Sequence, residues 1–418
     1  MDKLIITGKN KLKGSINVHG AKNAALPIIV SSLLTDQDIK LTNIPKVDDI
    51  HNMLKLLELY GSNIKSNKNF IIINNKNLKN ISADYDIVRK MRASILILGP
   101  LLSRFGYSKI SLPGGCAIGT RPIDIHLDGL VKLGAEFKIE NGFVIGIAKN
   151  RLRGNKIKLP FPSVGATENL LMASVLAKGE TLIDNAAREP EITDLGNCLI
   201  SMGAKIEGLG NRKILVEGVN KLNSTNYKII SDRIVAGTYI ILAIMLKSKF
   251  EVKNFKPIHL ESLLKTLIRM GGNLEILKNS VKIFPSNKLK SSKVKTGPYP
   301  GFPTDLQAQL MALMSIVEGK SEIKETVFEN RFMHVPELNR LGANIKLSKD
   351  KAYINGGQNY KAAQVMASDL RASVSLVLAA LCAEGKTTIN RVYHLDRGYE
   401  KIEKGIGKLG VKIKRVKS

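Results

Sequence analysis

The stretch PGGCAIGTRP, Pro113 to Pro122, is one of two features of the sequence that could support chemistry. Glycine and proline at this density exclude an ordinary helix or a central strand, so we expect a loop. A thiol in such a loop, with Arg121 near Cys116, meets the conditions for a lowered pKa and for reaction with electrophiles. The alternative is a β-turn whose cysteine takes no part in chemistry. The other two cysteines, Cys198 and Cys382, lie in apolar helical segments and are expected in the core.

Charged side chains also recur at six places where a strand is expected to lead into an apolar helix. These junctions read GAKNAA, VRKMRAS, PSVGAT, SDRIV, FPTDLQ and ASDLRAS. A helix N-terminus favours anions because its backbone N–H groups are free and its dipole is positive there. Three junctions add a cation and three an aspartate, namely Lys22, Arg92, Arg371, Asp232, Asp305 and Asp369. Each aspartate taken alone could be only a helix N-cap, but the repetition of charge favours function.

The elements that must position these residues form an internal repeat. An apolar residue followed by glycine recurs about every 70 residues. The glycines are Gly61, Gly134, Gly203, Gly271, Gly342 and Gly410. Each one ends an amphipathic segment, which predicts a left-handed helix C-terminus.

Every unit is expected to contain the same elements in the same order. An apolar helix such as TYIILAIML or SVSLVLAAL leads into a short strand, and a second, amphipathic helix ends at the repeated glycine. A hairpin such as AKIEGLGNRKILVEG and a further strand follow. Buried helices inside, with strands and polar helix faces outside, predict an α/β (or α+β) fold of six βαβαββ-type units.

The last unit is incomplete, because VKIKRV has no hairpin partner before the end of the sequence. The first residues, LIITGKNKLKGSINVHG, match the hairpin region ILVEGVNKLNSTNYKII and are expected to complete it. Two domains of three units follow from this closure. Residues 22–229 would carry the Cys116 loop, and residues 1–21 with 230–418 would carry Asp305 and Arg397. A cleft between two such domains is a natural ligand site.

Composition excludes several classes of function. The formal charge of +28 allows a nucleic-acid partner, but the lysines are scattered, aromatic residues make up 5% and there is no tryptophan. Three cysteines and no long apolar stretch predict a cytoplasmic protein without membrane insertion. No phosphate-binding or dinucleotide-binding glycine motif occurs, and the six histidines show no ligand spacing. We therefore expect neither a cofactor nor a metal.

Nine segments together resemble the UDP-N-acetylglucosamine enolpyruvyl transferases (1-carboxyvinyltransferases) of the EPSP synthase superfamily. They are GAKNAALPI (20–28), KMRASI (90–95), LPGGCAIGTRPIDIH (112–126), SVGAT (163–167), NAAREPEI (185–192), FPTDLQAQ (302–309), TVFENRFMHVPEL (326–338), SDLRAS (368–373) and DRGYE (396–400). The likeness runs from Met1 to the C-terminus, and the cysteine loop separates it from the sister family, the EPSP synthases. The resemblance implies an inside-out α/β barrel of three units in each of two domains.

The resemblance also implies a reaction. Members move the enolpyruvyl group of phosphoenolpyruvate to the 3′-hydroxyl of UDP-N-acetylglucosamine and release phosphate through a tetrahedral intermediate, which begins peptidoglycan synthesis. The implied partners are these two small molecules, with no cofactor, no metal, no nucleic acid and a monomeric chain. The alternatives are an enolpyruvylshikimate-phosphate synthase and, in another class, a basic nucleic-acid-binding repeat protein.

The family's residue roles carry over by motif. Cys116 resembles the acid, which can also form a covalent phosphothioketal with phosphoenolpyruvate, and Asp305 resembles the base. The implied anion-binding and intermediate-binding residues are Lys22, Asn23, Arg92, Arg121, Arg331, Arg371 and Arg397. The implied UDP-sugar contacts are Arg121, Pro122, Ile123, Asp124, Ile125, Ser163, Val164, Gly165, Asp305 and Val327. One departure is Phe161–Pro162, where some members carry a lysine, so a cationic contact to the diphosphate is in doubt there.

Overall fold

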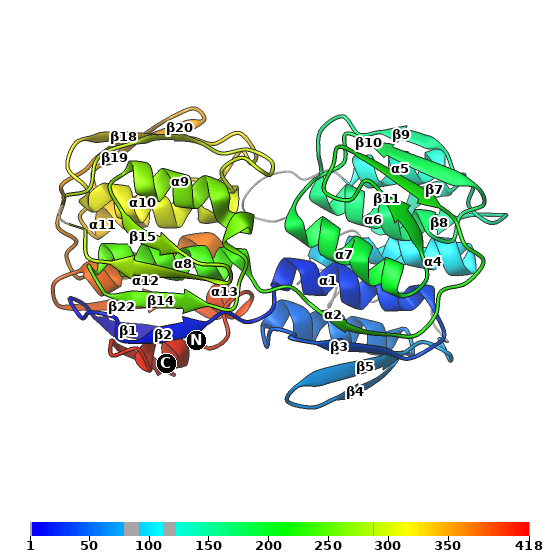
Figure 1. The fold of residues 1–418 in the computed structure, drawn as a ribbon, viewed down its shortest axis with the longest axis horizontal. Coiled ribbons are helices and arrows are strands. Elements are labelled where there is room, and N and C mark those ends of the chain that lie inside the picture. The colour runs from blue at the N-terminus through cyan, green and yellow to red at the C-terminus, as the bar shows by residue number, and fades with distance from the viewer. Residues whose placement is uncertain (1, 79–91, 112–122, 287, 418) are drawn as a thin grey trace. The chain divides into compact units, whose positions relative to one another are not determined.

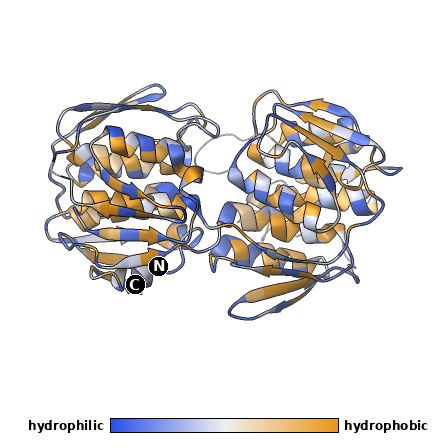
Figure 2. Ribbon diagram, viewed as in Figure 1, coloured by the Kyte–Doolittle hydropathy of each residue, from blue (hydrophilic) through white to orange (hydrophobic). Residues whose placement is uncertain are grey.

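The computed structural model describes residues 2–78, 92–111, 123–286 and 288–417, which fold into two compact units (Figure 1). Unit 1 contains the chain up to His19 and from Ser231 onward, and unit 2 contains Gly20 to Ile230 apart from the residues outside the described ranges. Each unit has its own hydrophobic core. In both units the interior helices and strands carry hydrophobic residues, while the outer loops are largely hydrophilic (Figure 2).

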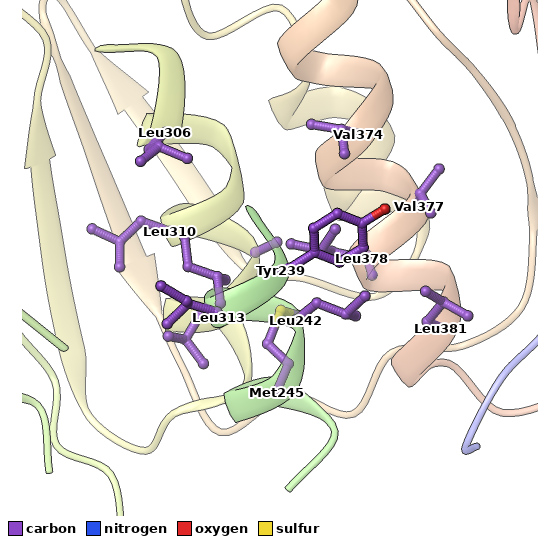
Figure 3. Close-up of a cluster of buried hydrophobic side chains, with 14 of the residues drawn as sticks. Tyr239, Leu242, Met245, Leu306, Leu310, Leu313, Val374, Val377, Leu378 and Leu381 are labelled. Carbon is purple, nitrogen blue, oxygen red and sulfur yellow. The ribbon is translucent and has the colours of Figure 1, made fainter. Parts of the chain in front are cut away.

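Three apolar helices form the core of unit 1. They are α8 (Arg233–Met245), α10 (Gln307–Ile316) and α12 (Leu370–Cys382). All residues of α8 are buried, as expected for a helix that is apolar on every side. Figure 3 shows side chains of the three helices packed in one cluster, among them Tyr239 and Leu242 of α8, Leu310 of α10, and Val377 and Leu381 of α12.

Unit 2 repeats this core with helices of the same kind. They are α1 (Lys22–Ser31), α4 (Leu98–Phe105) and α6 (Val164–Ser174), with the 3₁₀ segments η1 (Ser32–Leu34) and η2 (Arg92–Ile97) beside them. Leu98 and Leu101 of α4 and Leu170 of α6 are fully buried. The predicted apolar helices are thus the interior of both units.

Amphipathic helices alternate with these core helices along the chain. They are α2 (Asp48–Leu59), α5 (Asp124–Lys132), α7 (Pro190–Ser201), α9 (Glu261–Arg269), α11 (Val335–Arg340) and α14 (Ile402–Gly407). The six repeated glycines follow them with φ between 93° and 102°. The predicted left-handed helix C-termini are therefore confirmed.

Six small sheets lie in the described residues. Those of unit 2 are β13 (Thr225–Lys228), β3 (Ile39–Thr42), β5 (Phe70–Asn74) and β4 (Asn63–Ser66); β11 (Lys205–Glu207), β12 (Lys213–Glu217), β10 (Glu180–Asp184) and β9 (Lys156–Lys158); and β6 (Tyr107–Ser111), β8 (Phe143–Ile147) and β7 (Glu136–Glu140). Those of unit 1 are β15 (Asn273–Ile276), β16 (Ser280–Phe284), β14 (Phe250–Lys253) and β2 (Ser15–Asn17); β17 (Lys293–Lys295), β18 (Lys320–Lys324), β20 (Lys351–Asn355) and β19 (Ile345–Ser348); and β21 (Gln364–Met366), β22 (Lys386–Asn390), β1 (Lys3–Thr7) and β23 (Lys412–Val416).

Five of these sheets have one topology. A short strand pairs in parallel with a strand from another part of the chain and antiparallel with a strand of the following hairpin. In the last unit the hairpin partner is β1, since Leu4 lies opposite Ile389 of β22 and Ile6 opposite Ile413 of β23. The prediction that the first residues complete the last unit is confirmed, as is the mixed α/β class. No helix of the described residues is both long enough and apolar enough to cross a membrane.

Candidate functional site

Asp305 forms an ion pair with two arginines at the start of α10. It lies in the 3₁₀ segment η4 (Thr304–Leu306). One carboxylate oxygen is 2.6 Å from Arg331 Nη2 and the other is 2.8 Å from Arg371 Nη2. The Asp305 side chain is 26% exposed, whereas those of Arg331 and Arg371 are 5% and 7% exposed. The group therefore presents a proton acceptor beside two nearly buried cations.

Burial and charge act in opposite directions on Arg371. Burial on its own lowers the pKa of its guanidinium, but the charge of Asp305 and neighbouring groups raises the pKa above the ordinary arginine value. Arg371 therefore remains a cation inside the protein, available to an anion that competes with Asp305.

The three junction aspartates have different structural roles. Asp232 accepts hydrogen bonds from the N–H groups of Ile234 and Val235 at the start of α8. Asp369 caps α12 in the same way. These two are N-caps, as the structural alternative predicted. Asp305 makes no side-chain cap, and Pro303 occupies the N-cap position of η4.

Arg331 lies on a turn-rich segment that leads into α11. Its guanidinium carbon is 5.4 Å from the centre of the Phe328 ring. His334, three residues later, is almost completely buried. Burial lowers the pKa of His334 to about 4, the Asp369 charge opposes this and the Arg331 charge adds to it. Because His334 is neutral near pH 7, the positive charge of this segment is that of the Arg331 guanidinium.

Glu325 was missed by the sequence reasoning. It follows β18 and is 4% exposed. Its carboxylate accepts hydrogen bonds from the hydroxyls of Thr296 and Thr304 and from the N–H groups of Val327 and Phe328. Val327, an expected UDP-sugar contact, is 38% exposed on this segment. A single glutamate after a strand gives no sequence signal for such a network.

Arg397 follows the short helix α13 (Tyr393–Asp396). Its charge contributes, after burial, to the lowered pKa of His394. Tyr399 of the same DRGYE motif is buried and its hydroxyl is 2.9 Å from Thr238 Oγ1 on α8. The motif thereby connects the cation Arg397 to the core helices of unit 1.

In unit 2 Lys22 is the first residue of α1. Its Nζ is 3.1 Å from a carboxylate oxygen of Asp49 on α2, and the two side chains are 12% and 4% exposed. Asn23 follows on α1. Asp49 is a second residue that sequence reasoning missed, because an aspartate in the first turn of a helix is explained by the helix dipole alone.

Two further helix starts in unit 2 carry expected UDP-sugar contacts. Ile123 precedes α5, where Asp124 is exposed and Ile125 half-buried. Ser163 caps α6 through a 3.4 Å hydrogen bond that its hydroxyl accepts from Ala166 N–H. At Gly165 a Cβ atom would stand 3.2 Å from the His126 ring of α5. The structure thus brings together the starts of α5 and α6, and glycine allows their close approach.

Two features of α6 and its surroundings were not expected. Phe161, at the departure from the family pattern, is a 55% exposed apolar side chain before the helix. Glu168 is buried on α6, and burial, followed by repulsion from Glu191 and Glu189, raises its pKa well above the ordinary value.

Four expected site residues lie wholly or partly outside the part of the chain that the structure describes. Cys116, Arg121 and Pro122 lie outside the described residues, and the Arg92 side chain is also not described. Of the other cysteines, Cys198 is buried and Cys382 is partly exposed but packed against the core of unit 1. Burial raises the pKa of both thiols to about 12. Both are core residues with little thiolate at neutral pH, as predicted.

Known proteins resemble this chain over its whole length. The family model described as EPSP synthase (3-phosphoshikimate 1-carboxyvinyltransferase) matches residues 6–406. The UDP-N-acetylglucosamine 1-carboxyvinyltransferase of Pelagibacter ubique is 51% identical over 416 residues, covering 100% of both chains. The enzyme of the same name from Rickettsia rickettsii is 49% identical over 420 residues, again covering 100% of both.

Solved structures share the fold at lower identity. The enolpyruvyl transferase NikO from Streptomyces tendae superimposes with a TM-score of 0.90 at 23% identity, covering 99% of this chain and 98% of that one. An EPSP synthase from Acinetobacter baumannii has a TM-score of 0.78 at 18% identity, covering 100% of both chains. At these identities the structures compare the fold alone.

Proposed function

Because the chain belongs to the UDP-N-acetylglucosamine 1-carboxyvinyltransferases of the EPSP synthase family, we infer that it transfers the enolpyruvyl group of phosphoenolpyruvate to UDP-N-acetylglucosamine. The observation that carries this inference is identity near one half over the full length of such enzymes. The paired Asp305 adds a site of suitable chemistry, since the reaction needs a base and several cations. Phosphate is the second product, and the transfer begins peptidoglycan synthesis.

We propose addition followed by elimination. As the sugar 3′-oxygen attacks C2 of phosphoenolpyruvate, Asp305 takes the hydroxyl proton and C3 gains a proton from the acid Cys116. In the tetrahedral adduct C3 then returns a proton to the Cys116 thiolate while the bond from C2 to the phosphate oxygen breaks, and the leaving phosphate takes the proton held by Asp305, which forms the enol ether and phosphate and restores both residues. Lys22, Arg121 and Arg397 stabilise the phosphate charge, and Asn23 donates a hydrogen bond to the adduct.

The two nearly buried arginines support a further role. We propose that an anionic group of phosphoenolpyruvate competes with Asp305 for Arg331 and Arg371, while Arg92 assists. Substrate binding would then loosen the ion pair and expose the carboxylate to the sugar hydroxyl. The UDP-sugar contacts are proposed at Arg121 to Ile125, at Ser163 to Gly165 and at Val327, whose partial exposure suits contact with a ligand.

We propose that units 1 and 2 are the two domains expected from the sequence, residues 1–21 with 230–418 and residues 22–229. The inside-out α/β barrel of three repeats in each is supported by the core helices and the repeated sheet topology. We propose that the protein is a cytoplasmic, monomeric enzyme. It uses no cofactor, because the steps of the family reaction need only acids, bases and cations.

A phosphate-release assay tests the function. The purified chain should release phosphate only when UDP-N-acetylglucosamine and phosphoenolpyruvate are both present, and mass spectrometry should find the enolpyruvyl-sugar product. Release with shikimate 3-phosphate in place of the UDP-sugar would assign the sister activity instead. A steeply salt-dependent affinity for RNA without turnover of either acceptor would support the nucleic-acid-binding alternative.

A further inference from the structure

The internal repeat allows one position to be compared between units. Directly after the short strand, three units carry an asparagine in the left-handed region, Asn43, Asn185 and Asn254, with φ of 58°, 59° and 63°. Each side-chain amide donates a hydrogen bond of 2.8–3.0 Å to the carbonyl of the residue that follows the parallel neighbour strand. The asparagine is therefore a structural connection between two strand ends.

In the unit that contains Asp305, this position is Glu325. The carbonyl at the matching strand end belongs to Thr296, and the next residue, Thr326, donates its hydroxyl to that carbonyl at 2.7 Å. Glu325 does not have a positive φ. Thr326 thus makes the bond to the carbonyl that the asparagine makes in the other units, and Glu325 reaches this strand end by accepting a 2.8 Å hydrogen bond from the Thr296 hydroxyl.

The Glu325 carboxylate instead joins the two segments that carry the ion pair. One oxygen accepts a 2.9 Å hydrogen bond from the Thr304 hydroxyl, on the residue directly before Asp305. The other accepts bonds of 2.8 and 3.3 Å from the N–H groups of Val327 and Phe328. Phe328 in turn lies against the Arg331 guanidinium. A buried carboxylate held by this many donors is well satisfied and rigid.

We propose that Glu325 is a positioning residue that holds Asp305 and Arg331 at the spacing the reaction requires. This proposal rests on the proposed role of Asp305 as the base. Glu325 acts through Thr304, the residue before Asp305, and through Phe328, which lies against Arg331. Because small displacements of a reacting group reduce turnover strongly, loss of this connection should affect catalysis more than substrate binding.

Thr304→Val is the sharpest variant, because it keeps the side-chain shape and removes only the donor to Glu325. We expect kcat to fall about tenfold, with the KM for UDP-N-acetylglucosamine within about twofold of the wild-type value. The acidic limb of the profile of kcat/KM against pH should also move upward, because a base held less firmly by Arg331 is protonated more easily. Glu325→Ala should show the same changes, and the double variant should lose little more than either single one.

The variant Glu325→Gln tests whether the hydrogen bonds of this side chain or its negative charge is required. Its amide oxygen can accept hydrogen bonds from the Val327 and Phe328 N–H groups while its NH₂ donates to the Thr304 hydroxyl. We therefore expect kcat of this variant to lie within about threefold of the wild-type value, above that of Glu325→Ala. The matched control is Asn254→Asp, which breaks the equivalent connection in another unit. It should lower the melting temperature without moving the pH profile.

The outcomes are distinguishable. Wild-type kcat and an unchanged pH profile in folded Thr304→Val would overturn the positioning role, as would an equal profile shift in Asn254→Asp. If Glu325→Ala does not fold, Thr304→Val still decides. Absence of turnover in the wild-type enzyme under the same assay would refute the proposed function itself rather than this inference.

Discussion

Three aspartates at equivalent places show how little a residue's identity determines its role. Asp232 and Asp369 accept hydrogen bonds from N–H groups of their own helices, whereas Asp305 makes no such cap and directs its carboxylate to two guanidinium groups. The difference comes from the local backbone, because Pro303 takes the N-cap position and the 3₁₀ segment η4 displaces Asp305 from it.

Asp305→Asn should reduce turnover by about 10²-fold or more, since the amide keeps the shape but cannot accept the hydroxyl proton. Binding of UDP-N-acetylglucosamine, measured by titration calorimetry, should change much less. Asp350→Asn is the control, because Asp350 is an exposed carboxylate paired with Lys324. Near-normal phosphate release by Asp305→Asn would remove the base from the mechanism.

Cys116 should be the one cysteine that reacts readily with small electrophiles. Burial keeps Cys198 and Cys382 protonated, whereas a loop thiol near Arg121 is expected to be partly thiolate. The family resemblance implies that the epoxide fosfomycin, a phosphoenolpyruvate mimic, alkylates Cys116. Cys116→Asp should keep turnover and escape the drug, and Cys116→Ala should lose most turnover. Mass spectrometry that finds the adduct on Cys198 or Cys382 would leave the loop cysteine without a role.

Charged residues at the junctions could be recognised from the sequence, but the side chains that they pair with could not. Lys22 and Asp305 lie at helix starts, where the repeat draws attention to them. Asp49 and Glu325 have no such signal, because their importance depends on side chains brought near by tertiary packing. Carboxylates that act through contacts distant in sequence could therefore be recognised only from the structure.

At the scale of elements, the repeated glycine is the feature that the sequence predicted best. Its backbone conformation is local, so the preference of glycine for positive φ acts whatever the tertiary context. The pairing of strands from distant parts of the chain was harder to predict from the sequence. The match of the first residues to a hairpin predicted β1 correctly, but no local pattern indicates that β2 pairs with β14 or β13 with β3.

Gly134→Ala measures the strain at one repeated helix end. A Cβ atom there would meet nothing within 4 Å, so the cost comes only from φ of +97°. We expect a loss of about 1 kcal/mol in the free energy of unfolding. Gly297→Ala is the matched control, because its site is equally open but its φ is ordinary. Equal stability of the two variants in urea titrations would contradict the assignment of strain to the backbone.

At the scale of the whole molecule, the first strand joins the beginning of the chain to the last strands of unit 1. Ile6 of β1 is fully buried in the core of unit 1, far in sequence from its neighbours β22 and β23. Ile6→Ala should destabilise unit 1 by about 2–5 kcal/mol, as large-to-small core substitutions do. Ile183→Ala of β10, equally buried, is the counterpart in unit 2.

Hydrogen exchange should locate each effect. We expect Ile6→Ala to lower protection in the sheet of β21, β22, β1 and β23 and in α12, and Ile183→Ala to lower it around β10 and α6. Loss of protection confined to residues near Ile6 in sequence, with β22 and β23 unaffected, would show that β1 does not stabilise the last repeat.

The position of β1 also has a consequence for the order in which the chain matures on the ribosome. All strands of unit 2 have left the ribosome once β13 emerges, so that unit can form while translation continues. The strand β1 is made first, yet both of its neighbours, β22 and β23, are made last. It must therefore stay without those partners until β22 and β23 have been synthesised, and unit 1 can close only after β23 has emerged from the ribosome.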